Sequence, residues 1–99
     1  MDNKAKILDI AMNLNRIGNW AADDYRGKKK RITLFLDQNN SYLSSLEVID
    51  GKFKKTLALF KKKYKKLEKE GKTGPKDPLF WAEMMMTWGN ILTHRASFL

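Results

Sequence analysis

The stretch Lys52–Glu70, KFKKTLALFKKKYKKLEKE, decides how this chain folds and which surface it presents. Its aromatic residues and leucines recur at spacings of four, three, four and three, which places them on one stripe of an α-helix. Almost every other position is a lysine. The stretch therefore predicts a helix with a basic outer surface and a core-facing stripe of Phe53, Leu57, Phe60, Tyr64 and Leu67.

The net charge of the protein comes from this helix and the loop that follows it. From Gly51 to Lys76 the chain has eleven lysines and two acidic residues, and this local charge of +9 equals that of the whole chain. Lysines four residues apart on a helix repel one another, and an anionic partner would relieve that repulsion. We interpret the helix as a contact surface for a polyanion, most simply nucleic acid. The alternative is a solvated lysine-rich face without a partner.

Two groups of basic residues are the predicted nucleic-acid contacts. Those of the lysine-rich helix are Lys52, Lys54, Lys55, Lys61, Lys62, Lys63, Lys65, Lys66 and Lys69. The second, smaller group is Lys28, Lys29, Lys30 and Arg31. Asp23 and Asp24 precede the second group closely enough to pair with its lysines.

Length and composition predict one domain, residues 1–99, with 42% hydrophobic residues to build a core. The absence of cysteine excludes disulfides, thiolate nucleophiles and Cys-based zinc sites. No apolar run is long enough to span a bilayer, and Asp9 and Asn13 interrupt the N-terminal segment where a signal peptide would be apolar. We expect an intracellular, cytoplasmic protein without membrane contact.

The first of three further predicted helices spans Asn3–Asp24. Its apolar repeat is Ile7, Ile10, Leu14, Ile17 and Ala21. Gly18 lies beside this stripe and would let a neighbouring helix approach closely. Gly27 is the expected C-terminal cap, since glycine readily takes the left-handed conformation found there.

A second helix is predicted from Lys28 to Ile49, with an apolar repeat that continues across the polar run Asp37–Ser41. Asn39 occupies a core position within that run, so it must find hydrogen-bond partners. In coiled coils such an asparagine fixes register or oligomeric state. The alternative is that the polar run breaks the helix.

The last helix should begin at Pro78, after the loop Gly71–Lys76, with Asp77 as its N-cap. Apart from one polar strip through Glu83, Thr87, Asn90 and His94, its surface is apolar almost all round. Such a helix is either central in its own bundle or buried partly by another chain. We predict a homo-oligomer built through this helix; the competing expectation is a monomer whose other three helices enclose it. The predicted interface residues are Trp20, Trp81, Met84, Met85, Met86 and Trp88.

Catalytic chemistry has no candidate residues in this sequence. His94 is the only histidine, without cysteine or helix-spaced co-ligands, and Glu83 is a lone carboxylate on an apolar helix. We therefore expect a non-enzymatic protein without a metal or cofactor.

Four helices in about a hundred residues, the strong basic charge and the absence of a catalytic set together predict an all-α, antiparallel four-helix bundle. In architecture and charge the whole chain resembles the accessory variability proteins of diversity-generating retroelements, small basic bundles that form a ring and hold a reverse transcriptase with its RNA. The helical small subunits of CRISPR effector complexes are the second group it resembles. The resemblance implies an accessory subunit of a nucleoprotein complex, with RNA or DNA and a larger protein such as a reverse transcriptase as partners. The alternative function is a protein–protein adaptor whose lysine face docks an acidic protein.

Overall fold

Four helices make up most of the chain, and the computed structural model describes all residues from Met1 to Leu99. They are α1 (Asn3–Asp24), α2 (Lys29–Ser44), α3 (Phe53–Thr73) and α4 (Pro78–Arg95), followed by the 3₁₀ turn η1 (Ala96–Phe98). The structure contains no β-strand. The predicted all-α class is therefore confirmed.

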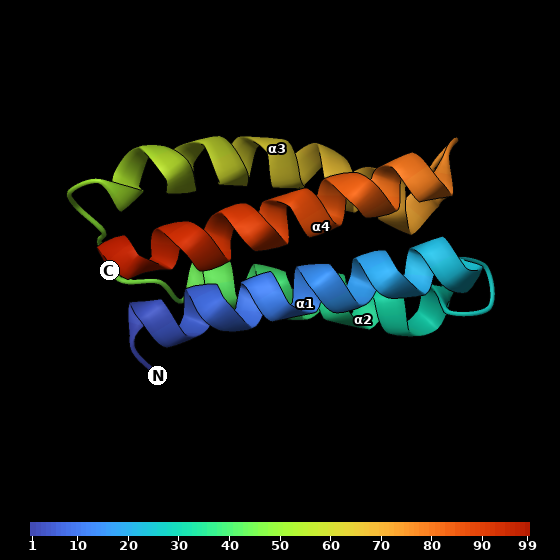
Figure 1. Cartoon of the computed structure of the whole chain (residues 1–99). Coiled ribbons are helices and arrows are strands. Elements are labelled where there is room, and N and C mark those ends of the chain that lie inside the picture. Colours follow the sequence, from blue (N-terminus) through green and yellow to red (C-terminus); the bar gives the residue numbers. More distant parts are fainter.

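Figure 1 shows the four helices side by side along one long axis, with both termini at the same end. The α1–α2 and α3–α4 connections lie at the opposite end, and the α2–α3 connection lies near the termini. Helices α1 and α3 each contact both α2 and α4. The molecule measures 39 × 20 × 18 Å. This arrangement is consistent with the predicted antiparallel bundle.

The predicted apolar stripes of α1 and α3 are buried throughout. In α2 the buried line is Ile32, Leu36 and Asn39, while Phe35 and Tyr42 are half-buried at its edge. The repeat in the sequence runs through Ile32, Phe35, Asn39 and Tyr42, so the side of α2 that faces the core is rotated slightly from the side that this repeat indicates. Together the four helices enclose one continuous core.

Helices α1 and α4 make the most extensive contact in the molecule, because two glycines let their backbones approach. A Cβ atom at Gly18 would lie 2.9 Å from the carbonyl oxygen of Ala82, and one at Gly89 would lie 3.0 Å from that of Ala11. Ala11 precedes Gly18 by seven residues on α1, and Ala82 precedes Gly89 by seven residues on α4. Each glycine faces the alanine of the other helix, so the two contacts follow opposite chain directions on α1 and α4. The expectation that Gly18 allows close helix approach is confirmed.

Replacing Gly89 with leucine should lower the free energy of unfolding by about 3 kcal/mol, since overpacking of this size meets backbone that cannot move aside. Urea denaturation measures this change. The control is Asn90→Leu, the next position on α4, where the exposed side chain should alter stability by no more than about 0.5 kcal/mol. Equal stability of the two variants would contradict the close α1–α4 packing.

Helix α2 ends at Ser44, five residues earlier than predicted. The side-chain amide of Asn3 on α1 donates to the carbonyl of Glu47 at 3.2 Å and accepts from its N–H at 3.0 Å. Lys6 donates to the carbonyl of Ser45 at 2.7 Å. These bonds from α1 hold the residues after α2 in an irregular connection, which explains why the helix stops although the apolar repeat continues.

The polar run inside α2 remains helical, as predicted, and Asn39 is fully buried within it. Asn13 on α1 donates to the amide oxygens of Asn39 at 3.0 Å and of Gln38 at 2.8 Å. The nearby Tyr64 hydroxyl donates to the carbonyl of Leu36 at 2.9 Å, and burial raises the pKa of Tyr64. The buried amides thus link α1 to α2 in one register.

Two of the predicted helix ends are corrected by the structure. Gly27 lacks the positive φ of a C-terminal cap, and its N–H donates to the carboxylate of Asp24 at 3.1 Å. Helix α3 continues through Gly71, where a side chain would collide with the ring of Trp81, and stops at Gly74 with a φ of 106°. Gly71 therefore provides space for a tryptophan and does not terminate the helix.

Candidate nucleic-acid interface

The exposed side of α3 carries eight of the nine predicted lysines, and the ninth, Lys52, is exposed at the position just before the helix. Burial of the apolar stripe fixes the rotation of the helix, so the positions between stripe residues point outward. None of the nine forms an ion pair with an acidic side chain. Lys52 has a different partner, since its ammonium nitrogen lies 5.2 Å from the centre of the Phe98 ring. The result is a positive surface that the rest of the chain does not neutralise.

These lysines cover the exposed arc of α3 from its α2 side to its α4 side. Glu68 contacts Asn40 of α2 and so marks the α2 side. Lys54, Lys61 and Lys65 precede Glu68 by fourteen, seven and three residues, spacings that place them on that same side. The positive surface is therefore broad, and on its α2 side it borders the polar side chains of Asn40, Ser41 and Ser44.

The acidic residues Asp37 and Glu68 form ion pairs where α3 meets α2. Lys72, which the predicted contact set did not include, pairs with Glu68 at 3.1 Å and with Asp37 of α2 at 2.5 Å. Hydrogen bonds to Asp37 and then to Glu68 raise the pKa of Lys72. This three-residue cluster ties α3 to α2 and leaves the outward lysines uncompensated.

The structure divides the second basic cluster. Lys28 pairs with Asp23 at 2.5 Å, as predicted, and its hydrogen bond lowers the pKa of Asp23. The guanidinium of Arg31 lies 5.3 Å from the centre of the Trp20 ring on α1. The other two lysines of the cluster are exposed and unpaired. Only half of this cluster is therefore free to contact a polyanion without breaking an existing contact.

Three of the predicted interface residues belong to the core of the single chain. Trp81, Met85 and Trp88 are 2%, 0% and 6% exposed. The indole N–H of Trp81 donates to the carbonyl of Leu67 on α3 at 2.9 Å. These three side chains are therefore enclosed within the single chain, mainly by α1 and α3.

The other three predicted interface residues are half-buried on different sides of the bundle. Trp20 packs edge-to-face on Phe35 of α2, with ring centres 4.9 Å apart. Met86 lies against Gly18 of α1, and Met84 lies on the α3 side of α4. These residues do not make one patch, so the homo-oligomer stays a prediction for which they offer no common surface.

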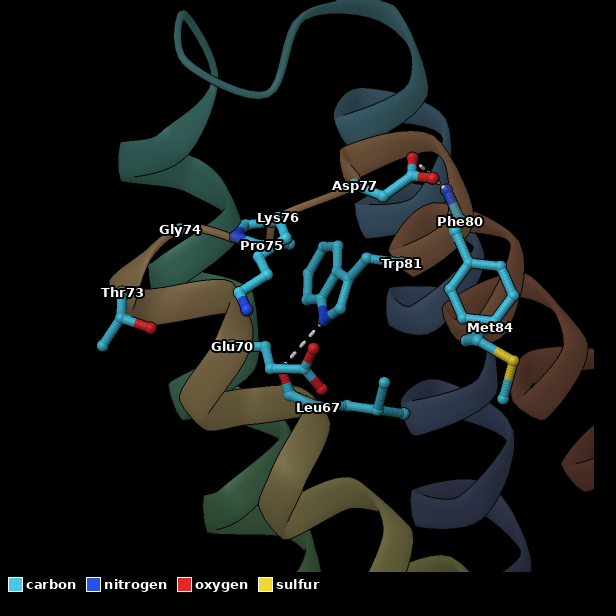
Figure 2. A pocket seen from close by; sticks show the side chains of 10 residues that line it. All are labelled: Leu67, Glu70, Thr73, Gly74, Pro75, Lys76, Asp77, Phe80, Trp81 and Met84. Carbon is cyan, nitrogen blue, oxygen red and sulfur yellow. Dashed lines mark hydrogen bonds between the residues drawn. The ribbon is translucent and has the colours of Figure 1, made fainter.

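Sequence reasoning missed a hollow of about 460 Å³ beside the α3–α4 connection. Figure 2 shows the Trp81 ring within it, with Phe80 and Met84 on the α4 side and Glu70 on the α3 side. Asp77 caps α4, as predicted, by accepting from the N–H of Phe80 at 3.1 Å. Phe80 itself is 60% exposed. The signal was present in the sequence, since apolar residues of α4 extend beyond any single buried stripe.

The structure brings together no group of three or more acidic, histidine or cysteine side chains that could hold a metal ion. None of its helices combines the length and apolar character needed to cross a membrane. No protein-family model, no curated protein and no solved structure matches this chain, so its function has to be argued from the geometry of its surface.

Proposed function

We propose that this chain is a non-catalytic nucleic-acid-binding subunit, an antiparallel four-helix bundle that acts as an accessory protein in a larger nucleoprotein complex. RNA is the expected nucleic acid. The observation that carries the proposal is the surface of α3 and its N-cap residue, where nine exposed lysines have no acidic partner. The architectural resemblance described above makes a reverse transcriptase complex the preferred setting.

Electrostatics explains why such a surface favours a polyanion. Lysines held at neighbouring positions of one rigid helix repel one another and gather counterions. A phosphate backbone replaces these counterions, and their release into solution drives binding without regard to base sequence. The surface offers no set of hydrogen-bonding side chains on which base recognition would depend, so we expect broad sequence tolerance.

Salt dependence tests the proposal directly. If six α3 lysines contact phosphates, the affinity of the protein for a labelled RNA or DNA strand should fall roughly a thousandfold between 50 and 200 mM salt. Fluorescence anisotropy at several salt concentrations gives the slope, about 0.7–0.9 log units per phosphate contact. Binding that ignores salt, or no binding at low salt, would refute the proposal.

Self-association is part of the same proposal, because several copies would join their α3 surfaces into a longer positive track. With Trp81, Met85 and Trp88 enclosed in one chain, the contact has to use other residues. Light scattering at micromolar concentration checks it. A mass that stays at 11.5 kDa over a range of concentrations would contradict assembly of the free protein.

A further inference from the structure

Two hollows lie between α3 and α4. The first is the one beside the α3–α4 connection, with Phe80 and Met84 on its α4 side (Figure 2). The second, of about 290 Å³, lies farther along the same two helices and is lined by Leu59 of α3 and Ile91 of α4, among others. Leu59 is 49% exposed, and Ile91 is half-buried. We call them the paired hollows.

Their separation matches the repeat of an α-helix. Met84 in the first hollow and Ile91 in the second are seven residues apart, which corresponds to about 10 Å along α4. A partner helix lying along α3 and α4 would present side chains at positions i and i+7 with this same separation. Helices that dock in grooves use such anchors at i, i+3 or i+4, and i+7.

The basic residues around the hollows have no acidic partners. Lys55 and Arg95 line the second hollow, and Arg95 has only a 3.4 Å hydrogen bond to the hydroxyl of Thr56. Lys63 lies one helical turn after Leu59, and Lys66 lies one turn before Glu70. Both lysines are exposed, and they lie on the α3 side of the space between the hollows. An occupant with acidic residues beside its apolar anchors would meet complementary charge at the second hollow and between the hollows, while at the first hollow Lys76 lies beside Glu70 and Asp77.

Charge also excludes the other simple occupants. A second copy of this chain carries a net charge of +9 and would add positive charge to this rim. A nucleic-acid strand would find Phe80 as the one exposed ring for a base to stack on, and its other exposed apolar neighbour, Leu59, is aliphatic. Glu70 and Asp77, in the first hollow, would repel its phosphates, whereas the carboxylates of an amphipathic helix can lie on the side that faces the lysines of α3.

We propose that the paired hollows bind an amphipathic acidic helix of a partner protein. The inference goes beyond the proposed nucleic-acid binding, because Lys54, Lys61 and Lys65 on the α2 side of α3 remain free when the α4 side is occupied. The accessory subunit would then hold a protein on one side of α3 and nucleic acid on the other.

The test uses a synthetic peptide of about 18 residues, long enough to span both hollows as a helix. Leucines occupy positions i, i+4, i+7 and i+11, and glutamates fill most other positions. Anisotropy of the labelled peptide should give a micromolar Kd for the unmodified protein. Leu59→Glu and Phe80→Glu, both at exposed positions, should each weaken binding at least tenfold. Leu34→Glu is the matched control, since Leu34 is 64% exposed on the outer side of α2.

Several results would overturn the proposal. One is no binding of the acidic peptide at about 1 mM. Another is equal binding of a scrambled peptide with the same composition, which would show that charge alone attracts it. An equal loss in the Leu34 variant would show that the hollows are not the site. If an oligonucleotide loses affinity in the Leu59 and Phe80 variants while Leu34→Glu keeps it, the hollows belong to nucleic acid instead.

Discussion

Binding to RNA or DNA is expected to weaken roughly a thousandfold at 0.1 M salt when Lys61, Lys62, Lys65 and Lys66 are all replaced by glutamine. Each phosphate contact contributes about 0.7–0.9 log units of affinity per tenfold change in salt concentration, so the loss of four contacts removes about three log units of affinity at 0.1 M salt. The loss should be the same for every sequence, and the slope against salt should become shallower by about three. Fluorescence anisotropy over a salt series measures both quantities.

The control for this experiment is the variant with arginine at the same four positions. It keeps the charge, so its affinity should stay within about tenfold of the original protein. Neither variant should unfold, because all four side chains are exposed and unpaired. If the glutamine variant binds as tightly as the original, the α3 surface is a solvated face or the docking site of an acidic protein.

Replacing Trp81 with alanine is expected to lower the free energy of unfolding by about 3–5 kcal/mol, the usual loss for a large buried aromatic side chain. The ring is 2% exposed, fills the space above Gly71 and donates a hydrogen bond to Leu67. For a domain with a total stability of about 5–15 kcal/mol, this loss leaves a marginal fold. Thermal and urea unfolding at low micromolar concentration measure it.

Phe80→Ala is the matched control, because it removes an adjacent aromatic side chain that is 60% exposed. This substitution should lower the free energy of unfolding by only about 0.5 kcal/mol. An interface role for Trp81 would give the opposite pattern, with little loss of stability at concentrations where the protein is monomeric. The comparison therefore distinguishes a core residue from an interface residue on the same helix.

The lysine surface and the paired hollows suggest a division of work on one helix. On the α2 side of α3, Lys61 lies beside the polar side chains of Asn40, Ser41 and Ser44, which suits a hydrated phosphate backbone. The α4 side places lysines beside Leu59, Met84 and Ile91, which suits an amphipathic protein segment. Glutamine substitutions at Lys54, Lys61 and Lys65 should therefore affect nucleic acid more than the acidic peptide.

Periodicity in the sequence determined α1, α2 and α3 and the buried stripes of α1 and α3. A repeat of three and four residues is a local property, so it predicts which side of a helix is apolar wherever that helix later packs. The same repeat fixed the outward direction of the lysines, since a stripe that faces the core leaves the other positions in solvent. The N-cap at Asp77 could also be predicted from the sequence, because its hydrogen bond reaches only three residues along the chain.

Tertiary contacts decided the rest. Helix α2 stops at Ser44 because Asn3, more than forty residues earlier, bonds to the backbone of Glu47. Trp81 is a core residue because Gly71 leaves room for its ring. The paired hollows exist because α4 packs most extensively on α1 and less on α3. Each of these outcomes depends on which distant segments meet, and a local repeat carries no information about that choice.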